Sequence, residues 1–153
     1  ISISGSGYIP SVNYYPTTLI KYQTTNDTIT GTPVPSLGGN RSNVSNVYNP
    51  QYGYYGGGIK FPGSTMYSDI RRFDFSSDTF SDTTANSHSH HSGTGVSSNH
   101  HGYFTQGYVP PGPAADTRRS TITKFDFSTE TASPQGTMNG GGDYNLGSMS
   151  NGI

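Results

Sequence analysis

The chain repeats the segment Ile122-Thr-Lys-Phe-Asp-Phe-Ser-Thr-Glu-Thr131 at intervals of about fifty residues. Its counterparts are Leu19-Ile-Lys-Tyr-Gln-Thr-Thr-Asn-Asp-Thr28 and Ile70-Arg-Arg-Phe-Asp-Phe-Ser-Ser-Asp-Thr79, which align with it without a gap. A looser element precedes each copy, in the order Gly7-Tyr8-Ile9, Gly53-Tyr54-Tyr55-Gly56 and Gly102-Tyr103-Phe104-Thr105. A repeat of this period indicates an array of small structural units that pack on one another.

Alternation of side chains predicts that the repeated segment is a β-strand followed by a turn. In the third copy Ile122, Lys124 and Asp126 fall on one face of an extended chain, and Phe125 and Phe127 fall on the other. The Ser, Thr and acidic residues that follow favour a turn, because their short side chains bond to nearby backbone. Each turn is expected to lead into a further strand, near residues 28–33, 79–84 and 131–134.

Two more strands complete each unit. A weaker strand is expected at 43–48, 93–98 and 144–150, and a turn then leads to the Gly-Tyr strand of the next copy. Four short strands at a period of about 40 to 50 residues are typical of a β-propeller blade, because blades bury their faces against each other. The sequence therefore predicts an all-β fold of three tandem four-stranded antiparallel β-propeller blades.

The blades are expected to form one repeat domain. Residues 1–6 take the place of the last strand of a preceding repeat, and the repeats themselves cover 7–52, 53–101 and 102–153. Closed propellers have roughly four to eight blades, and an open set exposes strand edges. We therefore expect part of a larger or oligomeric propeller, whose partners are other copies or further blades of the same protein. An open solenoid or filament of stacked sheets is the alternative.

Composition narrows the function classes. Hydrophobic residues make up 29% of the chain and charged residues 11%, with 12 Tyr and 7 Phe, so aromatic rings must supply much of the buried area. A formal net charge of −1 argues against nucleic-acid binding, which needs clustered Lys and Arg. No run of about eighteen apolar residues is present, so no membrane insertion is expected. The lack of cysteine excludes disulfides and thiolate metal sites.

The Gly-Tyr-aromatic strand followed by Phe125-Asp-Phe-Ser-Thr-Glu-Thr131 resembles a divergent Kelch-type propeller blade. In Kelch blades a glycine-ended strand precedes a Tyr-Asp-containing strand and a Thr-rich turn. More narrowly, the repeats are similar to Gly-Tyr-Phe-Gly-Gly-type repeats in virion structural proteins of cyanobacterial and marine phages, such as tail fibre or appendage proteins. The chain departs from Kelch in having no Trp and in lacking the diglycine at Thr105-Gln106 and at Pro10. The resemblance implies a Kelch-like propeller with a structural role.

A histidine tract is the one cluster typical of a metal site. On an extended segment His88 and His90 would point to the same side, as two metal ligands must. His91, His100 and His101 lie close in sequence. Phage tail fibres carry such His-X-His pairs around iron, so the resemblance implies iron as one candidate metal, and zinc is the other. The alternative is a solvated loop, since two or three imidazoles without carboxylates form an incomplete metal shell. No cofactor is expected.

Two further sets of residues are candidate surface sites. Tyrosines beside Asn, Asp and Gly in variable loops can stack on sugar rings, which makes a glycan or partner surface of Tyr14, Tyr15, Tyr67 and Tyr108. In the alternative reading these rings cap the neighbouring blade. Asn-X-Ser/Thr triplets make glycosylation candidates of Asn26, Asn40 and Asn43, which matter only in a secreted eukaryotic protein.

We find no catalytic constellation, and Asp74 and Asp126 recur with the repeat, which predicts a turn or inter-strand role. The leading hypothesis is a non-enzymatic structural or adhesive β-propeller of a phage virion appendage, a fibre or spike, located on the virion or outside the cell. It would present loops to a partner or host glycan. The alternatives are a carbohydrate-binding or protein-interaction module of a secreted or cell-surface protein, and a fragment of a propeller hydrolase or lyase.

Overall fold

The fold is all-β over the part of the chain that the computed structural model describes. The described residues are 2–3, 6–10, 19–23, 26, 28–34, 41–60, 65–87, 91–105, 107–109, 117–118 and 120–138. None of them lies in a helix, and so none forms a helix with the length and apolarity needed to cross a membrane.

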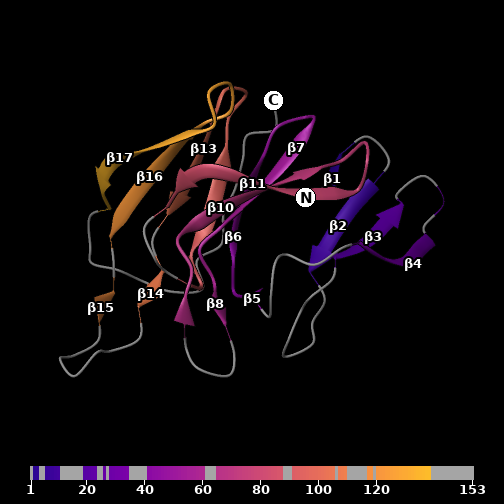
Figure 1. The fold of residues 1–153 in the computed structure, drawn as a ribbon, viewed down its shortest axis with the longest axis horizontal. Coiled ribbons are helices and arrows are strands. Elements are labelled where there is room, and N and C mark those ends of the chain that lie inside the picture. Colours follow the sequence, from indigo (N-terminus) through magenta and orange to yellow (C-terminus); the bar gives the residue numbers. More distant parts are fainter. Residues whose placement is uncertain are drawn as a thin grey trace.

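Three four-stranded antiparallel sheets carry the fold, and Figure 1 shows them side by side, from the indigo first sheet to the orange third sheet. The first sheet contains β1 (Ser2–Ile3), β2 (Ser6–Pro10), β3 (Leu19–Gln23) and β4 (Thr28–Val34). The second contains β6 (Ser45–Tyr48), β7 (Tyr52–Gly56), β10 (Asp69–Asp74) and β11 (Thr79–Asn86). The third contains β12 (Thr94–Ser97), β13 (His101–Thr105), β16 (Thr121–Asp126) and β17 (Thr131–Thr137). The prediction of an all-β fold with antiparallel sheets is confirmed.

The sheets are offset by one strand from the sequence repeats. β6 pairs with β7, and β12 pairs with β13, so each sheet begins with the weak strand that ends the preceding repeat. The strands that follow the turns are longer than predicted, since β4 ends at Val34, β11 at Asn86 and β17 at Thr137. The strand predicted at 144–150 lies outside the described residues.

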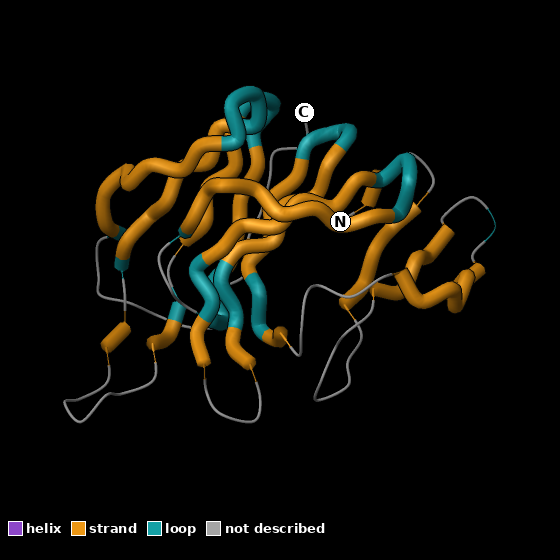
Figure 2. The backbone as a smooth tube through the Cα atoms, viewed as in Figure 1, coloured by secondary structure: helices purple, strands orange, loops and turns teal. Residues whose placement is uncertain are grey.

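Two small ribbons extend the second and third sheets at one end. They are formed by β5 (Arg41–Ser42), β8 (Ile59–Lys60) and β9 (Thr65–Met66), and by β14 (Tyr108–Val109) and β15 (Thr117–Arg118). The Pro- and Gly-rich segments after Gly58 and Gly107, for which no strand is predicted above, therefore contain the strand pairs β8–β9 and β14–β15. Figure 2 shows the ribbons at the lower end of the molecule and the hairpin turns of the second and third sheets at the upper end.

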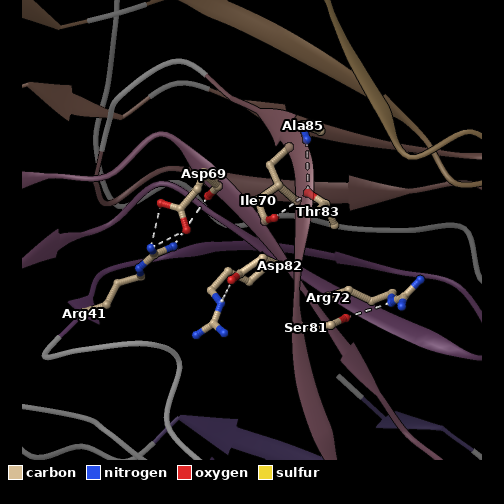
Figure 3. Close-up of polar contacts among 9 residues, drawn as sticks. Arg41, Asp69, Ile70, Arg72, Ser81, Asp82, Thr83 and Ala85 are labelled. Atoms are coloured by element: carbon tan, nitrogen blue, oxygen red, sulfur yellow. Dashed lines mark hydrogen bonds and ion pairs between the residues drawn. The ribbon is translucent and has the colours of Figure 1, made fainter.

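One buried arginine fastens the first ribbon to the second sheet. Arg41 is only 2% exposed, and its guanidinium donates to the two carboxylate oxygens of Asp69 at 2.7 and 2.6 Å (Figure 3). The same guanidinium lies 4.0 Å from the centre of the Tyr67 ring. A buried guanidinium requires this kind of bidentate partner, because its desolvation cost is otherwise uncompensated.

A core cluster lies between the second and third sheets and is built largely from the repeated aromatic residues. Phe73 lies opposite Gly53 and Phe125 lies opposite Gly102, and both phenylalanines are fully buried. Phe125 packs on Tyr54 of the second sheet, with ring centres 4.7 Å apart. Phe127 stacks on the same tyrosine at 5.4 Å. The predicted alternation therefore places these aromatic residues of the third sheet against its neighbour.

Glycine lets the inner strands of the two sheets approach each other closely. A Cβ on Gly102 would lie 2.4 Å from Val47 Cγ2, and one on Gly95 would lie 2.0 Å from the backbone oxygen of Asn46. The backbone N–H of Tyr48 also donates across the gap to Ser97 Oγ at 2.8 Å. β6 and the strand pair β12–β13 thus pack with no room for a side chain at these positions.

We expect Gly102→Ala to lower the free energy of unfolding by about 1–3 kcal/mol, because the added methyl group overlaps Val47 in a packed interface. Urea denaturation followed by tyrosine fluorescence measures the change. Gln135→Ala, at an exposed position of β17, is the matched control and should stay within about 0.5 kcal/mol of wild type. Equal stabilities of the two variants would contradict the close approach.

Candidate binding hollows on the turn rim

The hairpin turns of the second and third sheets gather at one end of the molecule, which we call the turn rim (Figure 2). It comprises residues 49–51, 75–78, 98–100 and 127–130. The Gly-Tyr strands are β2, β7 and β13, and we call β3, β10 and β16 the aromatic strands. Antiparallel pairing brings the turn before the Gly-Tyr strand beside the turn after the aromatic strand, because Tyr52 lies opposite Asp74 and His101 lies opposite Asp126. Each sheet therefore carries two adjacent turns on the rim.

The turns of the third sheet enclose a surface hollow of about 450 Å³, which we call the third-sheet hollow. It is lined by Asn49, Asn99, His100, His101, Asp126, Phe127 and Ser128. His101 Nε2 lies 3.5 Å from Asp126 Oδ2, and the rings of His100 and His101 are 6.4 Å apart. Amide, imidazole, carboxylate and hydroxyl groups thus surround one aromatic side chain.

An equivalent hollow of about 420 Å³ lies on the second sheet, and we call it the second-sheet hollow. It is lined by Pro50, Gln51, Tyr52, Asp74, Phe75 and Ser76. These six residues occupy the same register positions as six of the residues in the third-sheet hollow. The strand scaffold, the aspartate, the phenylalanine and the serine are constant, whereas the turn before the Gly-Tyr strand changes its side chains.

The two aspartates hold the turns together and stay ionised. Asp126 Oδ1 accepts from the Ser128 hydroxyl at 2.6 Å and from the backbone N–H groups of Ser128 and Thr129 at 2.8 and 3.1 Å. The Ser128 hydroxyl, followed by these backbone donors, lowers the pKa of Asp126 well below its ordinary value. Asp74 accepts the same three kinds of bond, and its pKa is lowered in the same way, mainly by Ser76. The predicted turn role of both aspartates is confirmed.

This arrangement is suited to binding a neutral, hydroxyl-rich ligand. Asp126 Oδ2 is not used by the turn and can accept from a ligand hydroxyl. His100 and Asn99 are exposed and offer further donors and acceptors. A depressed pKa keeps the carboxyl group from donating a proton near neutral pH, so it is suited to accepting hydrogen bonds and poorly suited to acid catalysis.

The predicted metal ligands His88 and His90 lie outside the described residues. His91 is described, and its Nδ1 lies 2.9 Å from Ser92 Oγ. Within the described ranges no group of three or more His, Asp or Glu side chains is arranged to hold a metal ion. Nothing in the described part of the chain brings His91 to the pair on the turn rim.

The other candidate residues are scattered. Tyr67 lies beneath Arg41 at the ribbon end, and Tyr108 lies in β14, of whose side chains nothing is described. Asn26 is exposed and its Oδ1 accepts from the Thr28 hydroxyl at 2.6 Å, and Asn43 is exposed in a left-handed conformation with φ 54°. The remaining candidates lie outside the described residues, and they are Tyr14, Tyr15 and Asn40.

The rim hollows were missed by the sequence reasoning, although a signal for them exists. The motif Asp-Phe-Ser ends the aromatic strand in the second and third copies, and the turn of residues 49–51 or 98–100 precedes the paired Gly-Tyr strand. Because one antiparallel strand ends where its neighbour begins, these segments must meet at the same end of the sheet. The lining residues are far apart along the chain, and only the register between neighbouring strands brings them together.

Acidification tests the role of the Asp126 carboxylate. We expect Asp126→Asn to be less stable than wild type at neutral pH, because a neutral amide accepts the turn bonds more weakly. A depressed pKa contributes stability that is present above the unfolded-state pKa of about 3.9 and is lost as pH falls through the folded-state pKa. The difference between the two proteins in urea denaturation should therefore shrink below pH about 4. A difference that is constant with pH would contradict this assignment.

Comparisons with known proteins give a fold likeness and no sequence relative. No protein-family model matches the chain, and no curated protein sequence matches it. The chain is similar in structure to YjhT, with a TM-score of 0.65 at 15% sequence identity. The likeness covers 80% of this chain and 45% of that one, so this chain spans less than half the length of that structure. At this identity the likeness shows a shared β-sheet fold and nothing about activity.

Proposed function

We propose that the three sheets are Kelch-like β-propeller blades and that the chain is a non-enzymatic structural and adhesive module. Three observations support the propeller. The sheets have four antiparallel strands in one order, the second and third sheets pack face to face through buried aromatic residues, and the overall arrangement is similar to that of YjhT. Rigid sheets of this kind hold their turns in fixed positions, which is what a presenting scaffold requires.

The observation that carries the adhesive role is the recurrence of the rim hollow on two adjacent sheets. Each hollow places an ionised carboxylate and a serine beside an aromatic side chain, a combination that binds sugar hydroxyls and the apolar face of a sugar ring. A shallow site of this size binds weakly by itself. Equivalent sites held at a fixed spacing on one rim bind a repeating glycan with greater strength, because the second contact is intramolecular.

The resemblance of the repeats to phage virion proteins gives the proposed setting. In that setting the chain belongs to a fibre or spike, lies on the virion or outside the cell, and presents its turn rim to a glycan of the host surface. Further blades, supplied by other copies or by more of the same protein, would complete the propeller. The same rim would serve a carbohydrate-binding module of a secreted protein, and immunolabelling of virus particles distinguishes the two settings.

Glycan binding by a multivalent form of the chain tests the proposal. The biotinylated chain is assembled on streptavidin and applied to an array of microbial surface polysaccharides. We expect Gln51→Ala and His100→Ala each to weaken the signal. The double variant should weaken it by about tenfold or more, because each hollow has then lost one of its polar side chains. Both residues are exposed, so the substitutions leave the core intact.

Gln135→Ala, an exposed change on β17 away from the rim, is the control and should bind as wild type does. Retained binding by the double variant would remove the hollows from the proposal. Binding to no glycan on the array would overturn the adhesive role, and cleavage of the bound polysaccharide, seen by mass spectrometry, would overturn the non-enzymatic one.

A further inference from the structure

The same ion pair joins each sheet to the next. Lys21 on β3 of the first sheet donates through Nζ to both carboxylate oxygens of Asp78 in the second sheet, at 2.9 and 3.2 Å. Arg72 on β10 of the second sheet donates to Glu130 Oε1 in the third sheet at 2.8 Å. In both cases the cation lies on an aromatic strand, and the anion lies in the turn after the aromatic strand of the following sheet.

The backbone of the acidic turn is the same in both sheets. Asp78 has φ 53° and Glu130 has φ 52°, a left-handed conformation that Gly, Asn and Asp tolerate best. A glutamate at this position is unfavourable for the isolated turn. The ion pair with the preceding sheet accounts for a carboxylate there, because the turn directs its side chain onto the neighbouring basic residue.

Neighbouring side chains complete the binding site for the Glu130 carboxylate. The Tyr54 hydroxyl donates to Glu130 Oε1 at 3.2 Å. Arg72 Nε donates to Ser81 Oγ at 3.1 Å (Figure 3). Val47, Tyr54, Arg72 and Ser81 form one cross-strand row on the face that the third sheet covers. Val47 and Tyr54 are fully buried in that contact. Burial and the Glu130 carboxylate together raise the pKa of Tyr54 well above its ordinary value.

The third sheet carries the same row on its other face. Its members are Val96, Tyr103, Lys124 and Ser133, paired in the same register. This face is opposite the one that bears Phe125, and the third sheet stands at the end of the row of sheets in Figure 1. Val96, Tyr103 and Lys124 are half-buried and Ser133 is exposed, and no carboxylate among the described residues is paired with Lys124.

The chain also carries the matching anion at its other end. Asp27 stands at the sequence position of Asp78 and Glu130, since the three repeats align without a gap. Asp27 itself lies outside the described residues, so its position in the turn is inferred from the repeat. One chain thus carries Lys124 on the face of its third sheet opposite Phe125 and the acidic residue Asp27 at the sequence position of Asp78 and Glu130.

We propose that Tyr103 and Lys124 form a docking site for the acidic turn of the first sheet in a second copy of this chain, with Lys124 paired to Asp27 of that copy. The inference rests on the proposed propeller. Two copies would contribute six sheets, within the roughly four to eight of closed propellers, and both contacts would be of this kind.

Charge reversal tests the pairing. In a dimer of the Lys124→Glu variant, the new carboxylate meets Asp27 at both contacts. In a dimer of the Asp27→Lys variant, the new ammonium group meets Lys124 at both contacts. Each variant should therefore self-associate about tenfold or more weakly than wild type, because like charges repel. An equimolar mixture of the two variants has opposite charges at both contacts. We expect the mixture to form heterodimers with a dissociation constant close to that of wild type. Sedimentation velocity with one variant fluorescently labelled measures all four samples.

Lys60→Glu, the same change at an exposed position of the ribbon β8, is the control and should self-associate as wild type does. Far-ultraviolet circular dichroism of each variant verifies the fold, and restoration in the mixture excludes misfolding as the cause of the loss. A monomeric wild-type chain at every concentration reached, or a mixture as weak as its components, would overturn the docking site. Glycan binding by the streptavidin-assembled chain does not depend on this contact, so the two proposals fail separately.

Discussion

The structure depends on the burial of sheet faces against neighbouring sheets. The side chains of one small four-stranded sheet cannot cover both of its faces. Its aromatic residues are therefore buried only when another sheet packs on them. Phe125 and Phe104 of the third sheet and Tyr54 of the second are fully buried because they meet in one such contact. The glycines of the inner strands serve the same contact, since they remove the Cβ atoms that would hold β6 and β13 apart.

The turns connect this packing to the surface. Asp74 and Asp126 close their turns through three hydrogen bonds each, and these turns are also where a carboxylate reaches the preceding sheet. One short hairpin therefore stabilises itself, ties two sheets together and lines a hollow on the rim. Changes in the turn before the Gly-Tyr strand alter the hollow without touching these bonds, as the exchange of Gln51 for His100 between the two sheets illustrates.

The sheets were predictable from the sequence because two independent signals agree on them. The alternation around Phe125 fixes which side chains share a face, and the Ser-Thr-Glu turn fixes where the strand ends. The ribbons were not predictable, because two-residue strands such as β8 and β14 are too short for alternation to show. The partner of Arg41 was also beyond the sequence, since Asp69 lies 28 residues away and meets it only through the fold. The hollows were predictable in part. The recurrence of their residues is seen in the sequence, but the proximity of these residues follows from the register between strands.

Among the described residues, both ion pairs between sheets place the cation on the earlier sheet and the anion on the later one. Stacking through such pairs is therefore directional, because each contact needs a basic residue on one sheet and an acidic turn on the next. This pattern of charges sets no limit to the number of sheets in a stack. Such a stack ends either by bending until its first sheet receives its last, or by adding a unit that lacks one of the two charges, so the curvature of the stack decides between a ring and a fibre.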